Sequence, residues 1–81
     1  MTLVVRLFAR CRDLAGADRV TIDVGEKVQL RDVRTALARQ FPALAGFLPR
    51  CAMAVNDQFA NDDVELTAGS EVAVIPPVSG G

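Results

Sequence analysis

A small α+β roll, in which a mixed β-sheet is covered on one face by one main helix, is the fold class that the sequence predicts. Several short segments are β-branched or alternate between apolar and polar residues, which favours strands. One longer segment between them has apolar residues spaced three and four apart, which favours an amphipathic helix. The length of 81 residues suits a single domain with a single core.

Two strands joined by a short polar connection are predicted at the start of the chain. Residues 3–9 (LVVRLFA) are β-branched and aromatic and partly alternate, whereas residues 19–24 (RVTIDV) alternate strictly. Residues 10–18 between them are polar and contain a glycine, which favours a turn or one helical turn. This spacing predicts an antiparallel hairpin.

The main helix is predicted to follow a break at residues 25–27 and to end at Pro42. Its apolar residues recur on one face over about three turns, and they are Leu30, Val33, Leu37 and Phe41. Residues 43–50 (ALAGFLPR) are apolar but contain a glycine and a proline, so a loop or a short helical turn is expected.

Short strands are predicted for the rest of the chain. Residues 52–55 (AMAV) favour a strand, Asn56-Asp57 a turn, and residues 58–60 a short edge strand. Residues 64–66 precede a turn at Ala68-Gly69, and residues 71–75 (EVAVI) form the last strand, which Pro76 stops.

This order of elements predicts the topology. A helix after the hairpin crosses one face of the sheet, so the first and last strands become parallel neighbours at its centre. The arrangement is a roll of the β-grasp kind, with a domain at residues 1–75 and an extended tail at 76–81, although other small α+β rolls satisfy the same order. The expected core has a sheet side and a helix side: Val4, Leu7, Val20, Ile22, Val72 and Val74 against Leu30, Val33 and Leu37.

Charge and composition argue against several classes of protein. The net charge of −1 lacks the basic excess that is typical of nucleic-acid binding. No apolar stretch approaches the roughly 18 residues that a membrane helix requires, and the first residues do not form a signal peptide. We therefore expect a cytoplasmic protein without nucleic-acid or membrane partners.

Residue types for catalysis are scarce in residues 1–75. The chain has no histidine and no CxxC pair, so we expect no metal site. Cys11 and Cys51 are expected to be free, semi-buried thiols, because a disulfide would be unusual in the cytoplasm. Asp62-Asp63 is best explained as a solvated turn. The body alone is therefore not expected to be an enzyme.

The segment at residues 76–81 (PPVSGG) points to a different kind of chemistry. Pro76 and Pro77 favour an extended course out of the sheet, so the six residues could reach about 20 Å. Gly80 and Gly81 have no side chains and could enter a narrow channel. The α-carboxylate of Gly81 would be ionised at neutral pH and would need activation by another protein. These features indicate a carrier worked on by partners.

The whole chain resembles the small subunit of molybdopterin synthase, the MoaD family. The resemblance is carried by LFARCRDLAG at residues 7–16, AVND at 54–57 and GSEVAVIPPVSGG at 69–81. The last stretch is the most specific, because the family typically ends in Pro-Pro-Val-[Ser/Thr]-Gly-Gly after a glycine-acidic turn and a strand. Ubiquitin-like relatives share the Gly-Gly but generally not the Pro-Pro-Val.

The resemblance implies a ubiquitin-like β-grasp sulfur carrier that binds no cofactor itself. A MoeB-type enzyme would use ATP to adenylate Gly81, and a sulfur-donating system would convert it to a thiocarboxylate. The tail would insert into a MoaE-type large subunit of a heterotetramer and give sulfur to cyclic pyranopterin monophosphate, building the molybdopterin dithiolene. The inserting residues would be Pro76, Pro77, Val78, Ser79 and Gly80.

The resemblance also implies a partner interface at Phe8, Phe59 and Ile75. A core role is the alternative for the two phenylalanines. The family often has an aromatic residue where this chain has Ile75.

Three other functions stay open at this point. The same carrier chemistry could serve thiamin or cysteine biosynthesis or tRNA thiolation. Gly81 could instead be joined to a lysine, as in a ubiquitin-like protein modifier. The chain could also be an interaction module whose tail is inert.

Overall fold

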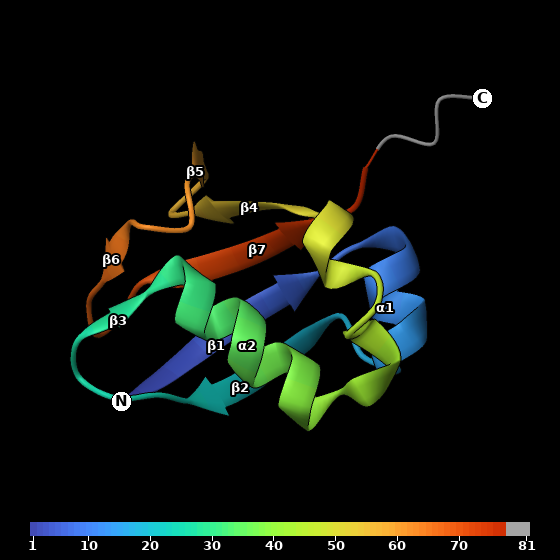
Figure 1. The fold of residues 1–81 in the computed structure, drawn as a ribbon, viewed down its shortest axis with the longest axis horizontal. Coiled ribbons are helices and arrows are strands. Elements are labelled where there is room, and N and C mark those ends of the chain that lie inside the picture. Colours follow the sequence, from blue (N-terminus) through green and yellow to red (C-terminus); the bar gives the residue numbers. More distant parts are fainter. Residues whose placement is uncertain (78–81) are drawn as a thin grey trace.

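The computed structural model describes residues 1–77 and has two layers, a β-sheet and the helices packed on one of its faces (Figure 1). The elements in chain order are β1 (Thr2–Leu7), α1 (Ala9–Ala15), β2 (Arg19–Asp23), β3 (Val28–Gln29), α2 (Leu30–Gln40), the 3₁₀ turns η1 (Pro42–Leu44) and η2 (Leu48–Arg50), β4 (Ala52–Val55), β5 (Gln58–Ala60), β6 (Glu65–Leu66) and β7 (Glu71–Ile75).

The main sheet has five strands in the order β2-β1-β7-β4-β5. β1 pairs with β2 as the expected antiparallel hairpin, and it pairs with β7 in parallel, from Val4 opposite Glu71 to Leu7 opposite Val74. The predicted parallel pair at the centre of the sheet is therefore confirmed. With α2 crossing one face, the fold is a β-grasp roll, as the order of elements predicted (Figure 1).

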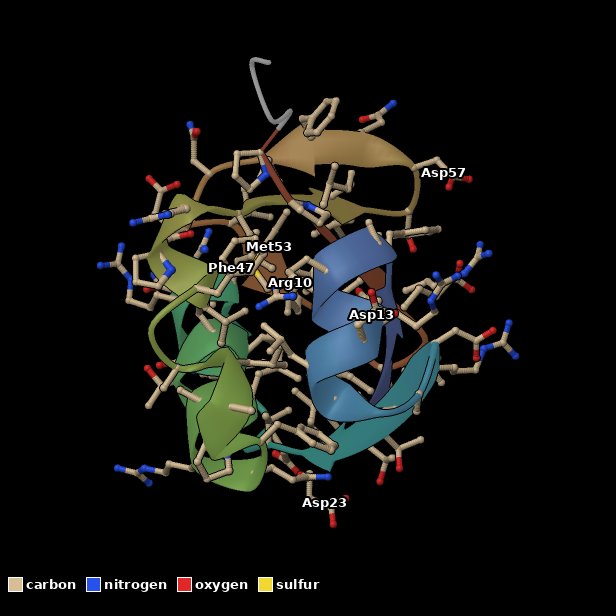
Figure 2. The ribbon with its side chains drawn as sticks, turned by 90° about the vertical axis from the view of Figure 1, so that its right-hand side faces the viewer. Arg10, Asp13, Asp23, Phe47, Met53 and Asp57 are labelled. Carbon is tan, nitrogen blue, oxygen red and sulfur yellow. The ribbon has the colours of Figure 1, made fainter. Side chains whose placement is uncertain are left out.

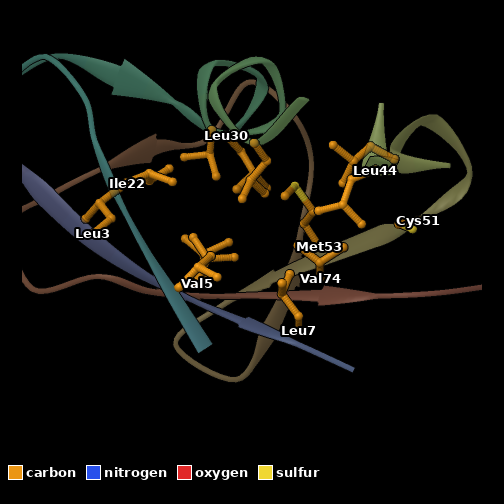
Figure 3. Close-up of a cluster of buried hydrophobic side chains, with 14 of the residues drawn as sticks. Leu3, Val5, Leu7, Ile22, Leu30, Leu44, Cys51, Met53 and Val74 are labelled. Carbon is orange, nitrogen blue, oxygen red and sulfur yellow. The ribbon is translucent and has the colours of Figure 1, made fainter. Parts of the chain in front are cut away.

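The core lies between the sheet and α2 and is built from every second residue of the strands (Figure 3). Leu3, Val5 and Leu7 of β1 are each at most 1% exposed. The prediction that Val4 belongs to the core is wrong. It pairs with Thr21 and Glu71 on the opposite face and is only half-buried, because side chains alternate along a strand. The other predicted core residues are buried, namely Leu7, Val20, Ile22, Leu30, Val33, Leu37, Val72 and Val74.

The segment after β1 is more helical than predicted. β1 ends at Leu7 rather than at residue 9, and α1 forms a seven-residue helix where a turn or one helical turn was expected. Gly16 ends this helix in the left-handed conformation, with φ of 78°, and its N–H donates to the Arg12 carbonyl. Cys11 is the residue of α1 that is buried.

A second, two-stranded sheet pairs β3 with β6 and supports the start of α2. The amides of Leu30 and Arg31 donate to the carbonyls of Val64 and Asp62, both at 2.9 Å. Gln29 and Asp32 complete a capping box, because the Gln29 N–H donates to the Asp32 carboxylate at 2.9 Å. This second sheet was not predicted.

The helices within residues 1–77 are all too short or too polar to cross a membrane.

Candidate functional site

The candidate site begins where β7 ends. β7 lies between β1 and β4, so the chain leaves the sheet from its central strand (Figure 1). Ile75 and Pro76 are half-buried, and Pro77 is exposed. The predicted stop of the last strand at Pro76 is confirmed. Val78, Ser79, Gly80 and Gly81, which the sequence assigns to the reactive tail, lie outside the described residues.

A pocket of about 430 Å³ adjoins this exit, and we call it the tail-base pocket. Its lining comes from three segments: Ala9 and Arg10 of α1, Phe47 and Arg50 around η2, and Pro76 and Pro77 after β7. The three segments meet there because β1 and β7 run in parallel and end on the same side of the sheet, where β4 begins. Figure 2 shows Arg10 and Phe47 between α1 and the η1–η2 segment.

Among the described residues of this lining, the charged ones are two exposed arginines, Arg10 and Arg50, and none is acidic. A positively charged, otherwise apolar hollow is suited to a partner segment that combines an apolar and an acidic side chain. The positive charge of the tail-base pocket therefore favours a partner that presents an acidic surface to it.

The sheet face opposite α2, which we call the open face, carries the three predicted interface residues. Phe59 is 74% exposed and Phe8 is 39% exposed, so the core alternative for both is wrong. Ile75 is half-buried and lies opposite Ala52 of β4. Phe59 lies opposite Ala54, which in turn lies opposite Ala73 of β7. The small alanines leave an apolar strip between Phe59 and the end of β7.

Phe8 is held at the edge of this strip by its neighbour on β1. The extended backbone at Phe8 continues the alternation, and the Arg6 guanidinium carbon lies 5.3 Å from the centroid of the Phe8 ring. Arg6 also pairs with Glu71 at 3.7 Å on the exposed surface. The apolar strip is therefore bordered, beside Phe8, by the charged pair of Arg6 and Glu71.

Titratable groups for catalysis are few in the described residues. No group of three or more His, Cys, Asp or Glu side chains within residues 1–77 is placed to hold a metal ion. Cys11 and Cys51 are free and fully buried rather than semi-buried, with their Sγ atoms 3.6 Å apart. Burial, followed by the hydrogen bond to Cys51, raises the pKa of the Cys11 thiol to about 12. Because the thiolate is the nucleophilic form, a thiol that holds its proton so strongly is a poor nucleophile in the folded protein.

Sequence reasoning missed the tail-base pocket, because its lining comes from segments about 40 and 25 residues apart. Pro49, in the first positions of the η2 turn beside Arg50, was one local indication of a turn in this segment. Asp62 was expected in a solvated turn. The turn is present, but the Asp62 carboxylate also accepts from Arg34 of α2 at 3.0 Å.

Comparisons with known proteins agree with this geometry. Residues 5–81 match the family model described as the ThiS family. The molybdopterin synthase sulfur carrier subunit of Chlamydomonas reinhardtii is 34% identical, and the alignment covers 100% of both chains.

Two solved structures share the fold over the whole of both chains. SAMP1 from Haloferax volcanii has a TM-score of 0.92 at 29% identity. A chain in the complex of subunits 1 and 2 of molybdopterin-converting factor from Helicobacter pylori has a TM-score of 0.71 at 27% identity.

Proposed function

The chain belongs to the ThiS family, and from this premise we propose that it is the sulfur-carrier small subunit of a molybdopterin synthase. The observation that carries the proposal is the full-length similarity to a curated carrier subunit of that synthase, with 100% of both chains covered. The described fold supports it, because a single small domain presents a proline-directed exit at its central strand.

The reacting group in this proposal is the α-carboxylate of Gly81. An adenylating enzyme of the MoeB type joins it to AMP from ATP and releases pyrophosphate. A sulfur-donating system then displaces AMP and leaves a thiocarboxylate. Its sulfur passes to cyclic pyranopterin monophosphate, and Gly81 returns to a carboxylate for the next cycle. The carrier binds no nucleotide itself, so ATP belongs to the partner.

The residues of this chain position the tail for that chemistry. Pro76 and Pro77 direct it away from the sheet, and Val78, Ser79 and Gly80 extend it into a MoaE-type large subunit. The open face, with Phe8, Phe59 and Ile75, contacts that subunit beside the tail. The Helicobacter pylori structure supports such a partner, since it contains both subunits of the converting factor. We further propose a heterotetramer that works in the cytoplasm.

The test is a reconstitution followed by mass spectrometry of the intact protein and of its tail peptide. After incubation with the adenylating enzyme, ATP and a sulfur source, the peptide ending at Gly81 should have one oxygen replaced by sulfur. Addition of the large subunit and the precursor should then yield molybdopterin.

A chain lacking Gly81 is the matched control, because the deletion removes none of the residues 1–77 that form the sheet and its helices. It should remain folded and acquire no sulfur. If the full-length chain remains without sulfur beside an adenylating enzyme that modifies another carrier, the proposal is wrong.

A second candidate function is protein modification through Gly81, which the likeness to SAMP1 favours, since a related structure is described as a small archaeal modifier protein. An isopeptide bond to a lysine would give adducts of higher mass that survive denaturation. Other sulfur destinations, in thiamin or cysteine biosynthesis or in tRNA thiolation, would be indicated by sulfur loading of Gly81 without molybdopterin formation.

A further inference from the structure

Two buried thiols that the proposed function does not use lie in contact. Cys11, on α1, and Cys51, directly before β4, are 40 residues apart in sequence, and their Sγ atoms are 3.6 Å apart. Cys11 is 0% and Cys51 is 5% exposed, and no disulfide joins them. Both residues flank the lining of the tail-base pocket, since Cys11 follows Arg10 and Cys51 follows Arg50.

We propose that Cys11 and Cys51 are a reversible disulfide site, oxidised by a low-molecular-weight disulfide such as glutathione disulfide. The bond would link α1 to the end of η2, which are two of the three segments that line the tail-base pocket. The site lies outside the tail and the open face, so this inference does not rest on the sulfur-carrier function.

The geometry allows the bond with small movements. The two sulfur atoms must approach by about 1.5 Å to reach the length of a disulfide. Rotation of the side chains can supply this, because one weak hydrogen bond, from Cys51 Sγ to the Phe47 carbonyl at 3.5 Å, is the other polar contact of either thiol within the described residues. Figure 3 shows Cys51 at the margin of the cluster of side chains that it draws.

The reaction is a balanced exchange of two electrons. The Cys51 thiolate attacks a sulfur of the small disulfide and expels one small thiolate, which leaves a mixed disulfide. The Cys11 thiolate then attacks the Cys51 sulfur, forms the protein S–S bond and expels the second small thiolate. Both cysteine protons end on the two small thiols, so the protein is oxidised and the small disulfide is reduced.

Because both thiols are buried, the disulfide can form only when the structure opens locally. Attack requires a thiolate in contact with the oxidant, and the raised pKa of Cys11 keeps its proton in the closed fold. Exchange must therefore pass through a local opening. Opening of α1 is suited to this, because the helix has only seven residues and its buried Cys11 lies against the Cys51 sulfur, which makes the first attack. Disulfides are rare in a reducing compartment, and those that do form there are usually transient.

The test uses the full-length chain in native buffer with excess glutathione disulfide. The monomer should lose the mass of two hydrogen atoms, and a digest should recover one peptide pair linked through Cys11 and Cys51. The bond closes a long loop, so Tm should rise by roughly 10 °C or more, and dithiothreitol should restore the starting value. Amide exchange at Cys11 and Cys51, which donate to the Phe8 and Leu48 carbonyls at 3.0 Å, should slow on oxidation.

The variants Cys11→Ala and Cys51→Ala are matched controls, and neither should show the mass loss or the rise in Tm. The chain in denaturant is the positive control, because its thiols are accessible. Two results overturn the proposal. In one, the native chain stays reduced while the denatured chain is oxidised. In the other, the oxidised monomer melts no higher than the reduced monomer.

Discussion

Cys11 shows at the scale of one residue how packing changes chemistry. Burial is the main cause of its raised pKa, and the hydrogen bond and Coulomb interaction with Cys51 act in the same direction. All three disfavour the thiolate, so the folded protein holds a proton that the unfolded chain releases near the ordinary value of 9.0. The stability of the fold must therefore depend on pH above that value.

We expect the free energy of unfolding to fall as pH rises from about 9 to about 12. Below pH 9 both states hold the proton, so the stability is fully present. Above it the unfolded chain binds fewer protons, which lowers stability by up to about 1.4 kcal/mol per pH unit. The chain has no tyrosine and one lysine, so few other groups titrate in this range.

Chemical denaturation of the reduced protein at a series of pH values measures this slope. The Cys11→Ala variant should lose most of it. Equal slopes in the variant and the parent would contradict the assignment to Cys11.

Asn56 shows what single positions in a sequence do and do not reveal. The turn at Asn56-Asp57 was predicted from residue type and is confirmed, with φ of 50° and 69° at the two residues. The sequence did not reveal that the Asn56 side chain accepts from the Glu71 N–H at 2.9 Å, while its own N–H donates to the Glu71 carbonyl. A turn is local, whereas a bond across 15 residues depends on the register of β4 and β7.

At the scale of elements, Arg34 connects α2 to two other segments. Its guanidinium donates to the carbonyl of Leu48, the first residue of η2, and to that of Cys51, directly after η2, and it pairs with the Asp62 carboxylate at 3.0 Å. The Arg34 side chain is 21% exposed, so these bonds are largely shielded from water. One side chain therefore fixes the η2 segment and the turn before β6 against the helix.

We expect Arg34→Ala to lower the free energy of unfolding by about 2–3 kcal/mol, because two carbonyls and a carboxylate lose a charged donor. Arg34→Lys should recover only a minor part, since an ammonium group cannot make the same planar set of bonds. Urea denaturation measures both changes.

Asp62→Ala is the matched control. It removes the more exposed partner and keeps both carbonyl bonds, so it should cost about 1 kcal/mol or less. An Arg34→Ala loss no larger than that of Asp62→Ala would show that the carbonyl bonds add little.

The elements that the sequence predicted well are those with a long or strict pattern. α2 has three of its four predicted apolar positions, Leu30, Val33 and Leu37, at helical spacing, with Phe41 as the C-cap after Gln40, and β2 alternates without a break. α1 was underestimated because its apolar face, Cys11 with the partly buried Leu14 and Ala15, spans little more than one turn, which is too short to reveal a period. β3 and β6 have two residues each, which is too short for any periodicity. Val4 was assigned to the core because residues 3–5 are all apolar, and the pairing with β2 and β7 decides their faces.

At the scale of the whole molecule, the open face and the exit of the tail lie together. The apolar strip reaches from Phe59 on the edge strand β5 to Ile75 at the end of β7. Resemblance to a known family identified both residues, and the structure shows that Phe59 is exposed. The tail-base pocket could not be found in this way, since it depends on how α1 and η2 pack.

We expect Phe59→Ser to weaken binding to the MoaE-type large subunit by roughly tenfold or more, because an exposed aromatic anchor is lost. Its effect on the free energy of unfolding should stay within about 0.5 kcal/mol, since the ring is 74% exposed. Calorimetric titration and thermal unfolding measure the two quantities.

Arg39→Ser on α2 is the control for a surface change in the other layer, and it should leave binding unchanged. Equal effects of Phe59→Ser and Arg39→Ser on affinity would argue against the open face as the interface.

The parallel pairing of β1 with β7 has a consequence for biosynthesis. A ribosome makes β1 first, and the β1–β2 hairpin can close over a short connection as soon as both strands have emerged. The other edge of β1 stays open until residues 71–75 have emerged, because its partner, β7, lies more than 60 residues further along the chain. Until then the nascent chain exposes an apolar strand edge, which can pair with another chain. Completion of the sheet is thus coupled to arrival of the segment that bears the tail.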